Sequence, residues 1–153
     1  MRPFGLAALY PAAERTLLRL VHAGTPYGIT PGEGWEGGSD PWTAPTAWSA
    51  WAFAALAREA RRSTAAPPQA GGRGPRTNLP VREAEDPSRP PRRSPDHRDR
   101  RAALKLLADL RRASTSAGDL PERVGVDTGI PASTTPLLWS SAFTVLALRE
   151  LWP

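Results

Sequence analysis

AWSAWAFAALA, residues 47–57, is the part of the sequence that decides the fold. Ser49 is its single polar side chain, and its large side chains would surround a helix: Trp48, Trp51, Phe53 and Leu56. A helix that is apolar on every face has to be buried on every side. At eleven residues the run is too short to span a bilayer. It predicts an interior helix over about 45–62, with Pro45 at the first helical position.

Two amphipathic helices are expected in addition. One spans about 12–23 and stops at Gly24, because glycine commonly ends a helix. The other spans about 95–113, with Ser94 as its N-cap. Their apolar residues recur at helical spacing: Leu17, Leu20 and Val21 in the first, Ala103, Leu106, Leu107 and Leu110 in the second. Each helix is expected to bury this face and expose the other.

A fourth helix is expected over about 136–151, with Thr135 as N-cap and Pro136 at its first position. Its large apolar side chains occupy all faces: Trp139, Phe143, Val145, Leu146 and Leu148. The order along the chain is therefore amphipathic, apolar, amphipathic, apolar, and only residues 124–126 suggest a short extended piece. Alternating outer and inner helices are what a double ring requires. We expect an all-α fold that forms part of such a barrel, with this last helix buried.

Residues 63–95 break the helical pattern. The segment contains eight prolines, a Gly-Gly-Arg-Gly run and almost no large apolar side chain. It cannot bury enough apolar surface to offset the entropy of ordering it, so we expect a disordered insertion rich in proline and arginine. The chain then divides into helical parts over 1–62 and 96–153, joined by a linker over 63–95.

Composition argues against several classes of function. The sequence has no cysteine, and its two histidines, His22 and His97, are far apart, so we expect no metal site and no cofactor. All but one of the twenty basic residues are arginine. They are dispersed, with no continuous basic helix face and no aromatic–basic stacking pattern, so nucleic acid is not an expected partner.

Nothing near the start of the sequence resembles a targeting segment. Arg2 is followed by a short apolar stretch over 4–10, which Pro11 interrupts. A signal-peptide core or a membrane span requires a longer run. The sequence as given is therefore expected to be cytoplasmic, with no membrane partner.

Two loop-and-helix blocks carry a resemblance to a known family. The first is Gly37-Gly38-Ser39-Asp40-Pro41-Trp42, followed by Thr46. The second is Gly118-Asp119-Leu120-Pro121-Glu122-Arg123-Val124, then Asp127-x-Gly129 and Thr135-Pro136-Leu137-Leu138-Trp139-Ser140. In this order, with a helix between them, they resemble the C-terminal part of the catalytic domain of glycoside hydrolase family 15, which includes glucoamylases and glucodextranase-like enzymes. Two positions depart from the family pattern: residues 25–31 contain no arginine, and Ser141 follows Ser140.

The resemblance implies an (α/α)6 barrel, in which six helical hairpins form a toroid, and an inverting hydrolysis of α-glucans. One carboxylic acid then protonates the leaving oxygen while a carboxylate roughly 6.5–9.5 Å away removes a proton from the attacking water. Glu122 matches the family's general base, and Trp42 and Trp139 match tryptophans that line its sugar pocket. Further candidates for contacts with the sugar are Trp35, Glu36 and Asp40.

The resemblance also implies that the general acid lies in an N-terminal half that this sequence lacks. Four helices cannot close a ring of twelve, so the chain alone is expected to be inactive, with an α-glucan and the missing half as partners. Two alternatives stay open: a non-catalytic carbohydrate-binding remnant, and a relative that acts on another glycan such as trehalose or dextran. Taken alone, Glu122 is also an ordinary loop carboxylate beside Arg123, and both Trp42 and Trp139 also suit core packing.

Overall fold

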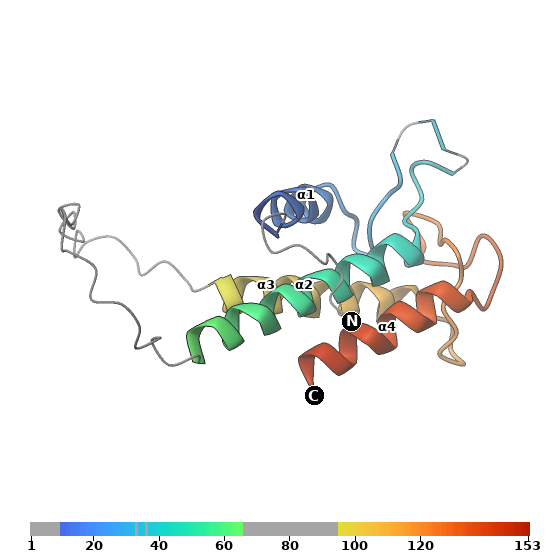
Figure 1. Ribbon diagram of the computed structural model, residues 1–153. Helices are drawn as coiled ribbons and strands as arrows, with labels where there is room; N and C mark the ends of the chain where they lie inside the picture. Colours follow the sequence, from blue (N-terminus) through green and yellow to red (C-terminus); the bar gives the residue numbers. More distant parts are fainter. Residues whose placement is uncertain (1–9, 33, 36, 66–94) are drawn as a thin grey trace, which may run out of the picture.

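The computed structural model describes residues 10–32, 34–35, 37–65 and 95–153. In this part of the chain the regular elements are four helices: α1 (Tyr10–His22), α2 (Thr43–Ala65), α3 (Pro95–Ala113) and α4 (Leu138–Leu151). The expected all-α class is confirmed for these residues. Figure 1 shows α2 in the middle, and this helix packs against each of the other three.

α2 supplies most of the core, as its apolar sequence predicts. Phe53 and its small neighbours are fully buried: Ala47, Ala50, Ala52, Ala54 and Ala57. Alanine side chains leave room for neighbouring helices on several sides, so α3 and α4 both pack along α2. The interior helix predicted over 45–62 is therefore confirmed, although Trp48 remains partly exposed.

The ends of α2 differ from the predicted ends. The helix begins at Thr43, so Pro45 is its third residue and not its first. It continues past Arg62 to Ala65. The hydroxyls of Ser63 and Thr64 donate to main-chain carbonyls four residues earlier, at 3.0 and 3.3 Å, which is compatible with a helical backbone. The rest of the predicted linker, 66–94, lies outside the described residues, as does the predicted cap at Ser94.

α3 has the predicted ends and the predicted buried stripe. Ala103, Leu106 and Leu110 are buried, and Leu107 packs against them. Two carboxylates, Asp99 and Asp109, are buried on the same helix. Sequence periodicity did not predict them, because an aspartate on an arginine-rich helix is ordinarily solvated.

α1 is amphipathic, as predicted, and is attached through its apolar face and through an ion pair. Leu17 is buried in the main core, with Leu20 and Val21 packed against it. Glu14 forms an ion pair with Arg98 of α3, whose guanidinium also lies 3.6 Å from the Asp99 carboxylate. Burial raises the pKa of Asp99 to about 6, although the Arg98 charge acts in the opposite direction.

α4 differs from the prediction at its start and in its burial. It begins at Leu138, so the predicted first position at Pro136 is wrong. Its N-cap is Leu137, with no side-chain capping bond, and Thr135 donates its hydroxyl to the Ser133 carbonyl instead. The helix is also not buried on all sides. Its inner face holds Ser140, Ala147 and Leu151, whereas the outer face is exposed along its length: Leu138, Trp139, Val145, Leu146 and Leu148. α2 and a short stretch of α3 cover only one side of it.

Candidate functional site

Two loops meet at one end of the helical bundle. Residues 23–42 lead into α2 and residues 114–137 lead into α4, and Figure 1 shows both loops at the same end. Isolated antiparallel bridges join Ile29 to Trp42, Trp42 to Arg123, and Val124 to Pro131. Trp42 is therefore the backbone position shared by the two loops. The sequence blocks that begin at Gly37 and Gly118 therefore contact each other through Trp42 and Arg123.

A buried hydroxyl pair fixes the start of α2 to the start of α4. The Thr43 and Ser140 hydroxyls are 2.6 Å apart, and both residues are fully buried. Thr43 also donates its hydroxyl to the Pro121 carbonyl, and its main-chain N–H donates to the Glu122 carbonyl at 3.0 Å. Buried polar groups are strongly destabilising when they lack partners. These contacts therefore fix the peptide groups on both sides of the Glu122 Cα atom.

Glu122, the predicted general base, is partly exposed, and both its main chain and its carboxylate are hydrogen-bonded. Its main-chain N–H donates to the Thr134 carbonyl at 2.8 Å. The Ser133 hydroxyl donates to its carboxylate oxygen Oε2. The role of Ser133 does not follow from the sequence, because its contact with Glu122 depends on the fold of the 114–137 loop. A carboxylate with a fixed orientation and access to solvent can remove a proton from water.

Trp42 and Trp35 form an aromatic pair beside this carboxylate loop. Their ring centroids are 5.8 Å apart and their planes meet at 84°, an edge-to-face geometry. Trp35 is 62% exposed, and Trp42 is half-buried. The indole N–H of Trp42 is buried and has no hydrogen-bond partner among the described residues. A donor of this kind could donate to a polar atom of a ligand.

Asp40 connects the two loops. Its carboxylate accepts a hydrogen bond from the Val126 N–H at 3.3 Å and lies 3.9 Å from the Arg123 guanidinium. The Arg123 side chain fills the space beside Gly37, where a Cβ atom would collide with it. Asp40 therefore makes loop-to-loop contacts in this structure. Glu36 lies outside the described residues.

Trp139 makes its ring contacts with residues other than Trp35 and Trp42. It is 66% exposed, so it is not a core residue of this chain. Its ring stacks on Phe143 with centroids 6.3 Å apart, and Phe143 in turn stacks on Trp51 of α2 at 5.7 Å. Trp152 is exposed just beyond the end of α4, where the Arg100 guanidinium lies 5.6 Å from its ring centroid.

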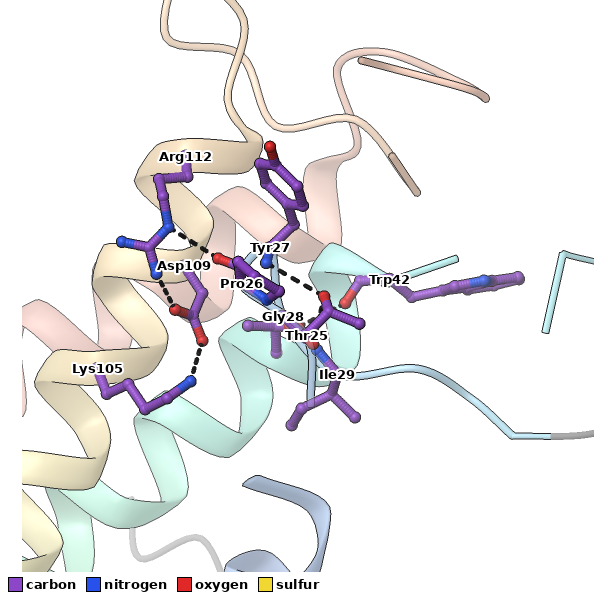
Figure 2. Close-up of polar contacts among 10 residues, drawn as sticks. Thr25, Pro26, Tyr27, Gly28, Ile29, Trp42, Lys105, Asp109 and Arg112 are labelled. Carbon is purple, nitrogen blue, oxygen red and sulfur yellow. Dashed lines mark hydrogen bonds and ion pairs between the residues drawn. The ribbon is translucent and has the colours of Figure 1, made fainter. Parts of the chain in front are cut away.

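A charged cluster on α3 supports the first loop and was missed from the sequence. Figure 2 shows Asp109 between Lys105 and Arg112, and Arg112 reaching the turn at Pro26. Arg112 donates through Nε to the Pro26 carbonyl at 2.8 Å and through Nη2 to Asp109. Charges three and four residues apart on a helix ordinarily suggest surface ion pairs. Only the tertiary structure shows that Asp109 is fully buried.

Comparisons with known proteins give no match, whether with protein-family models, with curated proteins or with solved structures. Among the described residues, no group of three or more His, Cys, Asp or Glu side chains could hold a metal ion. Within the same part of the chain, none of the helices has the length and apolar character needed to cross a membrane.

Proposed function

We propose that this chain is the base-bearing C-terminal segment of an inverting glycoside hydrolase that acts on α-glucans, of the glucoamylase type in family 15. The observation that supports it most is the contact between the two sequence blocks. Trp42 pairs with Arg123, and Thr43 donates to the Glu122 carbonyl. The residue proposed to remove a proton and a residue proposed to contact sugar are therefore held on adjacent backbone segments.

Glu122 acts as the general base in this proposal. Ser133 holds one of its carboxylate oxygens, and the other oxygen accepts a proton from the water that attacks the anomeric carbon. The exposed ring of Trp35 and the half-buried ring of Trp42 offer apolar faces for the C–H groups of a pyranose. The unpartnered indole N–H of Trp42 would donate to a sugar hydroxyl.

The general acid is proposed to come from an N-terminal half of the same enzyme. Asp40, the described carboxylate closest along the chain to Trp42, is already engaged by Val126 and Arg123. The same N-terminal half would supply helices to complete an (α/α)6 barrel. The exposed apolar face of α4 supports this, because contiguous apolar surfaces of this kind mark sites of packing or interaction.

A second candidate is a non-catalytic carbohydrate-binding remnant. The observation that favours it is the exposure of Trp35 and Trp139 in a chain whose candidate base has no described partner acid. Aromatic side chains bind sugar faces without any acid or base. In that case the Glu122→Gln variant would bind maltooligosaccharides as the parent chain does, and Trp42→Ala would not.

The test is glucose release from maltooligosaccharides by the chain alone, by a version extended with the upstream coding sequence, and by Glu122→Gln in the extended version. Activity only in the extended version, reduced by about 10³-fold or more in the variant, is expected for the loss of a general base. Asp119→Asn, which changes an exposed carboxylate of the same loop, is the matched control and should retain activity. Equal activity of Glu122→Gln and its parent would refute the assignment.

A further inference from the structure

Asp109 is a fully buried carboxylate at a place where α3 faces the first loop. Lys105 donates to it at 2.8 Å, and Arg112 donates to its other oxygen. Both cations keep about half of their side chains in solvent. A buried charge is strongly unfavourable unless it is paired and hydrogen-bonded, and both carboxylate oxygens of Asp109 have a partner. Its geometry is therefore fixed by α3 itself.

Arg112 connects Asp109 to the first loop. One edge of its guanidinium is held by Asp109, and its Nε donates to the Pro26 carbonyl at 2.8 Å. A planar guanidinium makes both bonds in one orientation, whereas a lysine ammonium is a point donor on a flexible stem. The hydrogen bond from Arg112 therefore fixes the position of the Pro26 carbonyl, which a positive charge near the loop would not do by itself.

The carbonyl of Pro26 belongs to a closed turn, so fixing it fixes the residues around it. The Thr25 N–H and hydroxyl both donate to the Gly28 carbonyl, at 2.7 and 3.1 Å. The next residue, Ile29, accepts from the Trp42 N–H at 2.9 Å and donates to the Thr46 hydroxyl, also at 2.9 Å. Figure 2 shows the turn between Arg112 and the Trp42 backbone, with the indole of Trp42 extending away from it.

The same turn also touches the loop that carries Glu122. The Tyr27 ring packs against Gly129, where an added Cβ would lie 2.3 Å from the ring carbon Cε1. Gly129 donates its N–H to the Gly125 carbonyl and belongs to the turn that follows Val124. On its other side, Gly28 lies against the Thr46 side chain with φ of 131°, so this position also admits no larger residue. The turn over 25–28 therefore contacts α3 through Pro26, α2 through Gly28 and the 114–137 loop through Tyr27.

We propose that Asp109 and Arg112 are a positioning pair that sets the orientation of Trp42, and of the Gly125–Gly129 turn, through the 25–28 turn. Neither residue touches the sugar. The nature of the ligand rests on the proposed function, but the positioning of Trp42 does not. Misplacement of a binding group by about 1 Å is enough to lower activity or affinity by tenfold or more, which makes distant positioning residues measurable.

The experiment compares Arg112→Lys and Asp109→Asn with Arg111→Lys, which changes the exposed neighbouring arginine in the same way. In the ¹⁵N-labelled full chain, the indole N–H resonance of Trp42 is assigned from its loss in Trp42→Phe. Amide exchange is followed at Ile29 and Trp42, with Phe53 in the core as the internal reference. Leu107→Ala, which loses core packing on α3, shows what general destabilisation does to the same signals.

In Arg112→Lys and Asp109→Asn we expect a shifted Trp42 indole resonance and amide exchange at Ile29 and Trp42 about tenfold faster, with Phe53 unchanged. In Leu107→Ala all three amides should accelerate together, and in Arg111→Lys none should. Equal exchange at Trp42 in Arg112→Lys and Arg111→Lys, or acceleration of Phe53 by the same factor, would overturn the proposal.

Titration with maltoheptaose separates this proposal from the proposed function. Binding that weakens about tenfold in Arg112→Lys and not in Arg111→Lys supports both. Faster exchange at Trp42 with no sugar binding by any variant, the parent included, supports the positioning pair and refutes a sugar site on this chain alone. Faster exchange with unchanged sugar affinity overturns the statement that the pair serves that site.

Discussion

α2 and α4 have the same kind of sequence and very different surroundings. Each is apolar around its whole circumference over about three turns, with charged residues only near its C-terminal end. α2 packs against three helices and buries Phe53 completely. α4 packs mainly against α2, and Val145 and Leu138 on its outer face are 54% and 77% exposed.

This difference shows that an apolar pattern predicts that a helix must be buried but does not identify the elements that bury it. A helix of this kind is stable in water only when something covers it. Within this chain α3, α4 and, to a smaller extent, α1 cover α2, whereas no described element covers the outer face of α4. The proposed missing helices of a barrel would do so.

The largest expected effect on stability is the loss of the buried ring at the centre of α2. Phe53→Ala removes a fully buried ring from α2 and should lower the free energy of unfolding by about 3–5 kcal/mol. Val145→Ala on the outer face of α4 should lower it by less than about 0.5 kcal/mol. Urea unfolding of both variants measures the difference. A loss of similar size in both would mean that the outer face of α4 is covered in solution.

A smaller effect is expected where the two helices are tied together. Thr43→Val removes the hydroxyl that contacts Ser140 and the Pro121 carbonyl, leaving buried groups without their partner. The free energy of unfolding should fall by about 1–3 kcal/mol. Thr16→Val, at an exposed hydroxyl of α1, is the control. Thermal or urea unfolding that leaves both variants equally stable would show that this buried link contributes nothing.

The smallest effect concerns α3, one of the helices that cover α2. Burial raises the pKa of Asp99 on α3 from 3.8 to about 6, so the folded state binds more protons between these values. The free energy of unfolding contributed by this group therefore falls as pH rises through that window. Asp99→Asn should raise the melting temperature by roughly 3 °C at pH 7 and change it little at pH 4.

The control for this pH dependence is Asp127→Asn, which alters an exposed carboxylate. The difference between Asp99→Asn and the parent chain is measured by circular dichroism melts at several pH values. A difference that is the same at pH 4 and pH 7 would contradict the assignment, because it would show that the charge of Asp99 is not the cause.

Much of the fold followed from local pattern, and less of the candidate site did. The ends of α3 and the buried stripe of Ala103, Leu106 and Leu110 were predicted because helical spacing of apolar residues is encoded locally. The capping prediction for α4 was wrong because Thr135 bonds within its own loop. Local pattern did not predict the roles of three residues. Ser133 and Arg112 contact residues at least eleven positions away in the sequence. Asp109 is buried only because of how α3 packs.

The sequence by itself determined that four helices form, that α2 is interior, and that two loop blocks contain an unusual set of tryptophans and carboxylates. These are properties of hydrophobic periodicity and residue type, which a chain specifies within a few turns of helix. Only the tertiary structure decided that the two blocks meet through Trp42 and Arg123, that a buried Asp109 faces the first loop, and that one side of α4 stays uncovered. Contacts between residues distant in sequence depend on how whole elements pack, and no local pattern carries that information.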